Sequence, residues 1–149
     1  MPIKTFRGQM SNDEIQTIHL HTNNGSTGYQ IHKMQMLAGT PNNQNTEGII
    51  TIWSNLVAAN AAVGLATVDF SNQDLLGVGF YSSSATATIY PEDQIIIFDN
   101  MVFNQDAYLV CNTGNAAPLN YYIELEQRKL DLNENTVATL KDIRNIATL

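Results

Sequence analysis

Leu75-Leu76-Gly77-Val78-Gly79-Phe80-Tyr81 is the stretch of the chain that most directly indicates its fold. Large apolar residues alternate with small ones in its centre, so Leu76, Val78 and Phe80 are expected on one face of a β-strand. Three serines follow at residues 82–84 and interrupt the pattern, and residues 85–90 resume it. The period of two residues predicts a strand here.

Similar strand signals recur on both sides of this stretch, at intervals of roughly ten residues. Within residues 28–37 the apolar phase shifts between Ile31 and Met34, which predicts a β-bulge. Eight to ten antiparallel strands at this spacing predict a mainly β fold, a β-sandwich or jelly roll. The remaining strands are expected at residues 3–8, 15–22, 48–56, 68–70, 94–98, 107–111 and 120–127.

Three segments between the strands have the character of turns and loops. Residues 23–26 read Asn-Asn-Gly-Ser, a strong Asn-Gly turn signal, and residues 39–46 are polar. Residues 57–64 read Val-Ala-Ala-Asn-Ala-Ala-Val-Gly. Alanine favours helix, but eight residues ending in glycine are marginal for one. We therefore expect a loop there, with room for a single helical turn.

The C-terminal residues change to a helical period. Asn133 is a good N-cap, Glu134 suits a helix start, and Lys141 and Arg144 suit the later turns. The sequence thus predicts a β-sandwich domain at 1–132 and a short helical arm at 133–149. The arm's apolar stripe consists of Val137, Leu140, Ile143 and Ala147.

Docking of this arm defines the expected assembly interface, formed by Val137, Leu140, Ile143, Lys141 and Arg144. A helix this short needs a docking surface to be stable in water. Residues 128–132 look like an extended connector, which favours docking on a neighbouring subunit. Packing against the arm's own sheet is the alternative.

The composition favours a protein whose surface meets other protein surfaces. The chain has 149 residues, the size of one domain, and 44% of them are hydrophobic. Only 14% are charged, and asparagine, with 17 residues, takes their place. A neutral, amide-rich surface costs less to desolvate than a charged one. A loop-rich β protein would show the same composition, so both interpretations stand.

The charge pattern disfavours nucleic acid and anionic membranes as partners. The net charge is −7, and no Lys or Arg occurs from Met34 to Gln127, where nine acids lie. Phosphate binding needs clustered bases, which the centre of the chain lacks. The bases lie towards both ends of the chain, where they would suit an acidic partner or serve as ordinary solvated charges.

Cys111 is the only cysteine, so no disulfide can form within the chain. It lies in the apolar run Tyr108-Leu109-Val110-Cys111 and is expected to be a buried core residue. No signal peptide or membrane-length apolar segment is visible, so the chain is expected to fold in a cytoplasm.

Candidate metal sites are incomplete, and we expect neither a metal nor another cofactor. His19 and His21 share a strand face, and His32 could add a third nitrogen, but zinc needs three or four convergent ligands. Asp99 and Asp106 flank a short apolar run and could offer oxygens to calcium, although the EF-hand pattern is absent.

Catalytic residues are not expected either. Glu124 and Glu126 share a strand face, as paired acid and base groups would, but their alternation with apolar residues suits an outward-facing strand. The chain has no G-x-S-x-G, HExxH or phosphate-binding glycine loop. Exposed aromatics could instead bind carbohydrate, and the candidates are Tyr81, Tyr90, Tyr121 and Tyr122.

Four blocks of the sequence resemble a known group of proteins. They are residues 3–8 (IKTFRG), 98–106 (FDNMVFNQD), 120–126 (NYYIELE) and 139–144 (TLKDIR). Together they resemble small virion structural proteins of marine tailed bacteriophages, such as those that infect cyanobacteria. Residues 39–66 and 82–90 match no pattern of this kind.

The resemblance implies a non-catalytic particle component made in the host cytoplasm. A capsid decoration (cement) protein is the first expectation, with the major capsid protein or other virion proteins as partners and a homotrimer as the favoured assembly. A coat subunit, a tail or fibre-adaptor component, and a carbohydrate-binding β-sandwich are the alternatives.

Overall fold

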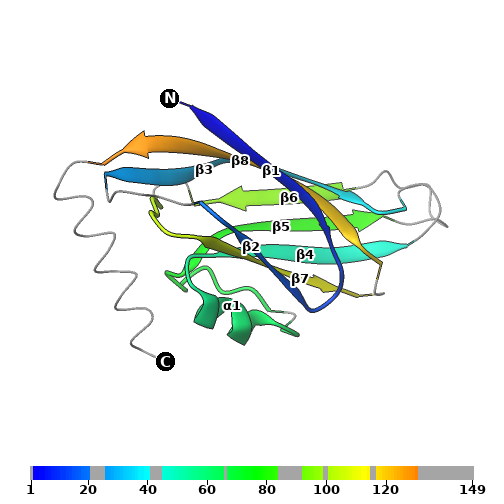
Figure 1. Cartoon of the computed structure of the whole chain (residues 1–149). Coiled ribbons are helices and arrows are strands. Elements are labelled where there is room, and N and C mark those ends of the chain that lie inside the picture. The colour runs from blue at the N-terminus through cyan, green and yellow to red at the C-terminus, as the bar shows by residue number, and fades with distance from the viewer. Residues whose placement is uncertain are drawn as a thin grey trace.

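The computed structural model describes residues 2–20, 26–40, 45–65, 67–83, 92–98, 101–114 and 117–130. These residues form eight strands and one short helix (Figure 1). The elements are β1 (Ile3–Met10), β2 (Glu14–Ile18), β3 (Thr27–Ala38), β4 (Thr46–Trp53), α1 (Leu56–Ala62), β5 (Leu75–Ser83), β6 (Glu92–Ile97), β7 (Ala107–Thr113) and β8 (Leu119–Lys129).

The strands form two antiparallel sheets, which confirms the expected mainly β fold. One sheet has three strands in the order β1-β8-β3, and the other has five in the order β2-β7-β4-β5-β6. Every ladder is antiparallel. The first strand therefore pairs with the last, so the two ends of the described chain lie in one sheet.

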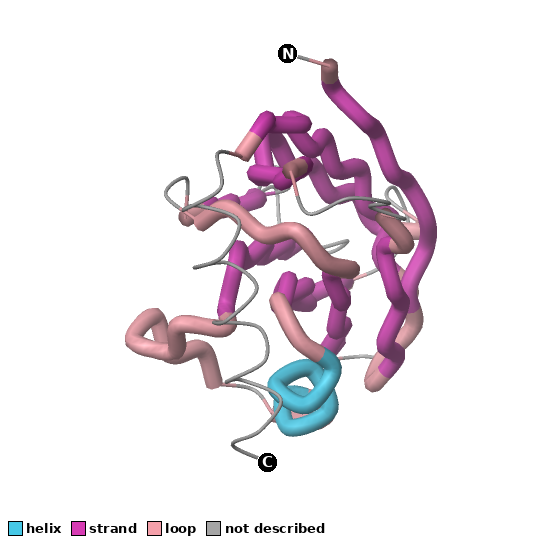
Figure 2. Tube along the Cα trace, turned by 60° about the vertical axis from the view of Figure 1, so that its left-hand side comes forward, coloured by secondary structure: helices cyan, strands magenta, loops and turns pink. Residues whose placement is uncertain are grey.

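The main core lies between the two sheets. Ile123 of the three-stranded sheet and Ile50 and Leu109 of the five-stranded sheet are fully buried in it. A Cβ at Gly79 of β5 would collide with the Met36 sulfur of β3, so the sheets approach closely there. Figure 2 shows the strands around this core, with α1 on the outside.

The predicted bulge in β3 is confirmed. Ile31 pairs with Leu125 and Lys33 with Glu124, so His32 is the extra residue. Both Ile31 and Met34 are buried, which is why the shift is visible in the sequence: the bulge keeps two apolar residues of opposite parity on the core face.

A second bulge changes the prediction for β5. Ile52 pairs with Gly77 and Trp53 with Leu75, which makes Leu76 the extra residue. Leu76 packs in the core between the sheets, whereas Val78 packs in a second cluster on the outer side. The expectation that Leu76 and Val78 share a face is therefore wrong, because a bulge among residues that are all apolar or small leaves no trace in the alternation.

Helix α1 replaces the loop that was expected at residues 57–64. Asn55 caps it, and its side-chain oxygen accepts a hydrogen bond from the Ala58 N–H at 2.8 Å. Ala59 and Ala62 are buried in the second cluster, beside Trp53. The prediction failed because the helix is stabilised by its cap and by packing on the sheet, and not by its length.

Residues 68–70, predicted as a short strand, form none. Val68 is 39% exposed and Phe70 is 53% exposed. The Asp69 carboxylate accepts hydrogen bonds from the N–H and hydroxyl of Ser71, and these bonds lower the pKa of Asp69. This local side-chain turn competes with strand pairing.

The end of β8 corrects the expected connector at residues 128–132. Arg128 and Lys129 belong to β8 and pair with β3, and Leu130 is buried with its N–H bonded to the Ser26 carbonyl at 2.7 Å. At most Asp131 and Leu132 remain to connect the predicted arm. Several predictions lie outside the described residues: most of the 23–26 turn, the strand at 85–90, and the arm at 133–149 with its interface residues Val137, Leu140, Lys141, Ile143 and Arg144.

Candidate functional site: two unlike outer faces

The structure places the candidate metal ligands that it describes, His19, His32 and Asp106, in different parts of the fold. Asp106 accepts a hydrogen bond from the Leu20 N–H at 2.9 Å, and the His19 Nδ1 lies 3.5 Å from its second oxygen. Asp106 therefore holds the chain that follows β2. His32 lies on β3 in the other sheet. Within the described residues, no group of three or more His, Cys, Asp or Glu could hold a metal, and His21 and Asp99 lie beyond them.

Cys111 is a core residue, as predicted. It is fully buried in the cluster between the sheets. Burial raises the pKa of its thiol to about 12, and the carboxylates of Glu14 and Asp13 add to the shift. The reactive thiolate is therefore disfavoured near neutral pH.

Glu124 and Glu126 lie on the outer face of the three-stranded sheet. The ladder places Glu124 between Thr5 and Lys33. Desolvation, followed by the hydrogen bond to Glu124 and its charge, raises the pKa of Tyr122. Glu124 thus has a phenol and a lysine as neighbours, in the arrangement of an outward-facing strand.

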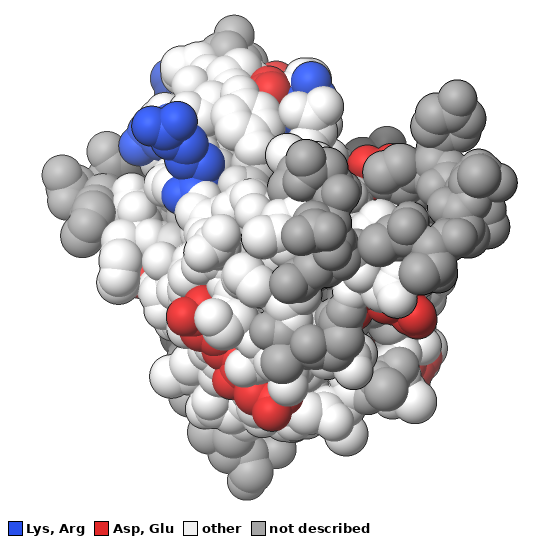
Figure 3. All heavy atoms as spheres, turned by 90° about the vertical axis from the view of Figure 1, so that its right-hand side faces the viewer, with Lys and Arg blue, Asp and Glu red and all other residues white. Residues whose placement is uncertain are grey.

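The charges are divided between the two sheets. Every Lys and Arg that the structure describes lies on the three-stranded sheet, where five bases meet two acids and give a formal charge of +3. The rest of the described chain carries eight acids and no base, a formal charge of −8. Figure 3 shows basic atoms in the upper part of the molecule and acidic atoms mostly below them. The bases are Lys4, Arg7, Lys33, Arg128 and Lys129.

The four tyrosines that were predicted as candidates for carbohydrate binding differ in their exposure to solvent. Tyr81 and Tyr121 are buried, and the Tyr121 hydroxyl donates to the Gln16 side chain at 2.7 Å. Tyr90 lies outside the described residues. Tyr122 is half-buried, and it lines a shallow pocket of about 330 Å³ together with Gln35, Leu37 and Asn120.

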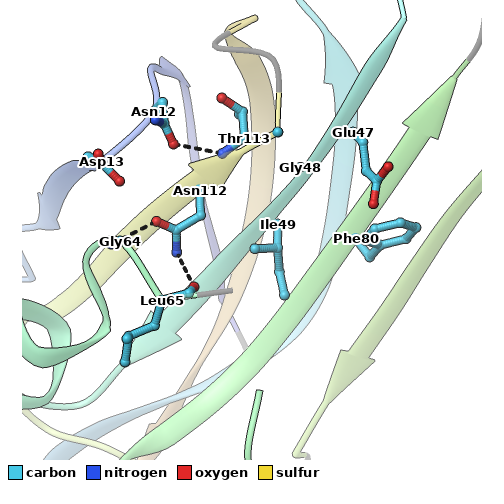
Figure 4. A pocket seen from close by; sticks show the side chains of 11 residues that line it. Asn12, Asp13, Glu47, Gly48, Ile49, Gly64, Leu65, Phe80, Asn112 and Thr113 are labelled. Atoms are coloured by element: carbon cyan, nitrogen blue, oxygen red, sulfur yellow. Dashed lines mark hydrogen bonds between the residues drawn. The ribbon is translucent and has the colours of Figure 1, made fainter. Parts of the chain in front are cut away.

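A larger pocket, of about 400 Å³, opens where the β1–β2 turn meets β4, β7 and the end of α1 (Figure 4). Asn112 ties these parts together: its oxygen accepts from the Gly64 N–H at 3.0 Å, and its amide donates to the Leu65 carbonyl at 3.0 Å. Asp13 and Glu47 bring two carboxylates to the lining. Gly64 has a φ of 79°, a conformation that suits glycine.

An apolar pocket of about 260 Å³ adjoins it on the outer face of the five-stranded sheet. Ile49 and Phe80 line both pockets. The two pockets are therefore neighbours that share these two residues, and together they are called the outer groove below. Its apolar part is completed by Val68, Phe70, Val78 and Ile96.

Sequence reasoning missed the outer groove. The available signal was the cluster Leu65, Val68 and Phe70 in a segment that has no strand partner, and the structure leaves these side chains 52%, 39% and 53% exposed. Large apolar side chains exposed together on one surface mark an interaction site more often than a solvated loop.

Comparisons with known proteins give no relative: no family model, no curated protein and no solved structure matches the chain. Among the described residues, no helix has the length and apolar character that a bilayer crossing requires.

Proposed function

We propose that the chain is a non-catalytic structural protein of a bacteriophage virion, and specifically a capsid decoration protein. The observation that carries the proposal is the division of charge between the two sheets. A decoration protein needs one face that meets the capsid and another that does not. Faces of opposite charge favour one docking orientation and disfavour the reverse.

The docking face proposed here is the outer face of the three-stranded sheet. Two of the blocks that resemble phage virion proteins, residues 3–8 and 120–126, are paired strands of this sheet, from Ile3 opposite Glu126 to Gly8 opposite Tyr121. Arg7 and Lys33 are exposed there, beside half-buried Tyr122. Arginine and tyrosine are enriched where proteins meet, so an acidic patch on the major capsid protein is the partner that this face fits.

The strand order supports a jelly roll as the finer description of the fold. In that fold the first strand pairs with the last, the second with the second-last, and so on inwards, so the pairs are nested. Three nested pairs are present, namely β1 with β8, β2 with β7, and β4 with β5. The strand β6 pairs with β5, while β3 pairs with β8. The fourth nested pair, β3 with β6, is therefore absent as a ladder, and these two strands contact each other between the sheets instead. The virion role further implies assembly in the host cytoplasm and, in our proposal, a homotrimer.

Binding to particles tests the docking face. The variant Arg7→Gln/Lys33→Gln removes two positive charges from it, and Thr67→Glu/Gln73→Glu changes the net charge equally at exposed positions of the acidic side. We expect the first variant to lose binding to virions depleted of this protein, and the control to bind as wild type does. Equal binding by both variants would contradict the docking face.

Cryo-electron microscopy of virions that contain the chain tests the role itself. A decoration protein appears as separate density on the outside of the capsid shell, at symmetric positions. Density within the shell would identify a coat subunit, and density at one vertex or on the tail would identify a tail or adaptor component. Either result would overturn the decoration role.

Carbohydrate binding is a second candidate function, favoured by the surroundings of Tyr122. The pocket beside its ring has amide groups from Gln35 and Asn120, and Gln9 donates to Asn120 at 3.1 Å. An aromatic ring with amides around it suits a sugar, which offers C–H groups for stacking and hydroxyls for hydrogen bonds. Glycan-array binding that is lost in Tyr122→Ala and kept in Phe70→Ala, an exposed aromatic in the loop between α1 and β5, would support this function.

A further inference from the structure

The outer groove combines an acidic part with an aromatic part. Asp13 and Glu47 line the larger pocket. Phe70 lines the apolar pocket, and its ring meets the Phe98 ring edge-to-face with centroids 5.3 Å apart. Phe80 lines both pockets and so lies where the two parts meet. A ligand that is complementary to the whole groove therefore offers a positive charge to one part and an apolar group to the other.

The two carboxylates are available to such a ligand. Both acidic residues are exposed, and within the described chain neither carboxylate forms a hydrogen bond or an ion pair. The turn that carries Asp13 is fixed on β7, because the Asp13 N–H donates to the Cys111 carbonyl at 2.8 Å and the Asn12 side chain accepts from the Thr113 N–H at 2.9 Å. Asp13 has a φ of 62°, a left-handed conformation that aspartate tolerates. The position of its carboxylate is therefore set before any ligand binds.

The apolar part presents large side chains to solvent. Phe70 is 53% exposed, Val68 is 39% exposed, and Phe80 and Ile96 are half-buried in the same pocket. Large apolar side chains exposed together mark an interaction surface. Gln94 is exposed at this pocket too, and its amide can donate to a carbonyl oxygen of a bound chain.

The distance between the two parts determines how the groups of the ligand are spaced. Asn112 of β7 lies in the acidic part, Val78 of β5 lies in the apolar part, and β4 runs between these two strands. Two strand spacings amount to roughly 10 Å. In a polyproline II helix, residues three positions apart point in the same direction and lie about 9 Å from each other. A basic and a large apolar residue at this spacing reach both parts of the groove.

We propose that the outer groove binds a proline-rich segment of a partner protein, in which a basic side chain lies three residues from a large apolar one. The basic group lies between Asp13 and Glu47, and the apolar side chain lies against Phe70 and Phe80. Aromatic-lined grooves are a common docking site for proline-rich segments, because these are already extended before they bind. The groove is on the five-stranded sheet, so this binding goes beyond the virion role and leaves the proposed capsid-docking face free.

Titration of the isotope-labelled full chain with synthetic peptides, followed by NMR, tests the proposal. The probe is the capped peptide Arg-Pro-Pro-Leu-Pro. Arg-Leu-Pro-Pro-Pro has the same composition without the three-residue spacing, and Glu-Pro-Pro-Leu-Pro has the opposite charge. The backbone amide signals of Ile49 and Phe80 report binding at the groove, and their shifts give the Kd.

The acidic part is tested with Asp13→Asn/Glu47→Gln, since asparagine tolerates the left-handed conformation at residue 13. The matched control Glu124→Gln/Glu126→Gln removes two carboxylates from the three-stranded sheet. We expect the Kd for the probe to rise at least roughly threefold in the first variant, a modest change because exposed ion pairs are weak, and to stay within about twofold in the control.

The aromatic part is tested with Phe70→Ala. Its matched control is Leu37→Ala, which shortens a side chain of similar exposure, 51%, on the three-stranded sheet. Aromatic side chains contribute much of the binding energy at protein interfaces, so the Kd should rise at least roughly fivefold in Phe70→Ala and stay within about twofold in the control.

The two control peptides should bind at least roughly threefold more weakly than the probe. Equal binding of the three peptides would overturn the proposal, as would the absence of saturable shifts at Ile49 and Phe80 or wild-type affinity in either groove variant. Self-association of the chain that is lost in Asp13→Asn/Glu47→Gln would assign the groove to a second copy and would overturn it too. The assay needs no particle, so its failure leaves the virion proposal unaffected.

Discussion

The two sheets share one core but present outer faces of different chemistry. Their inner faces supply the same kind of residue, such as Ile123 on one side and Ile50 on the other, and both are fully buried. The three-stranded sheet carries the described bases, with Arg7 and Lys33 on its outer face, whereas the five-stranded sheet carries α1 and the outer groove with acids at one end. The difference shows that the core determines how the sheets pack, while the chemistry of each outer face is independent of that core.

The largest expected effect comes from the shared core. Ile123→Ala and Ile50→Ala each remove a fully buried branched side chain, so each should lower the free energy of unfolding by roughly 2–5 kcal/mol. Urea denaturation measures both. Leu37→Ala, at a position 51% exposed on the three-stranded sheet, is the control and should change stability by less than about 0.5 kcal/mol. A small effect at only one of the two isoleucines would show that the sheets do not share a single core.

The next largest expected effect is a dependence of the free energy of unfolding on pH, which comes from Cys111. Burial is the largest cause that raises the pKa of this thiol, from an ordinary value of 9.0 to about 12 in the folded chain. The raised pKa means that the folded state resists ionisation. The associated stability is complete below pH 9 and is lost as pH rises towards 12, about 4 kcal/mol in all at 1.36 kcal/mol per unit. Urea titrations at pH 8 to 12 follow the loss.

The Cys111→Ala variant separates the thiol from the tyrosines. Burial also raises the pKa of Tyr108 and of Tyr121, so part of the decline above pH 10 should remain in the variant. The decline that starts near pH 9 should disappear. If it persists in Cys111→Ala, some other group is responsible and the thiol is more accessible than its burial indicates.

The sequence predicted the features that depend on near neighbours. The bulge after Ile31 was visible because apolar residues change parity there, and Cys111 was correctly placed in the core. The bases were seen to lie towards both ends of the chain, but their position on one sheet follows from the pairing of β1 with β8. That pairing joins residues more than a hundred positions apart, and no local pattern encodes it.

The outer groove could not be predicted from the sequence, because its residues also come from distant parts of the chain. Ile49 and Phe80 come from different strands, and Leu65 and Asn112, 47 positions apart, meet through the hydrogen bond to the Leu65 carbonyl. The bulge at Leu76 and the helix α1 were missed because packing on the sheet determines both. The strand predicted at residues 68–70 failed because apolar character alone does not show whether a segment has a strand partner.

A smaller effect is expected beneath α1, where the outer face of the five-stranded sheet is covered. The Trp53 indole N–H donates to the Thr51 hydroxyl at 2.7 Å, and both residues are buried. Thr51→Val keeps the shape but leaves this N–H without its acceptor, which should cost about 1–3 kcal/mol. Urea denaturation measures the loss in the free energy of unfolding, and Thr67→Val, at an exposed position, is the control. A neutral Thr51→Val would mean that water reaches Trp53 and that α1 does not seal this part of the face.

The smallest effect distinguishes the bases of the three-stranded sheet from one another. The Lys4 ammonium donates to the Tyr29 hydroxyl at 3.2 Å and lies 5.4 Å from the centre of its ring, so this base takes part in the fold. Lys4→Met should therefore lower the free energy of unfolding by about 0.5–1 kcal/mol, the usual value of a cation–π contact near the surface. Lys129 is exposed at the end of β8, and Lys129→Met should change it by less than about 0.5 kcal/mol. Thermal and urea denaturation of the pair at low and high salt measure the difference. Equal losses in the two variants would mean that the bases stabilise this sheet through their combined charge. The bases would then serve the stability of the fold, and this would count against a role for them in binding a partner.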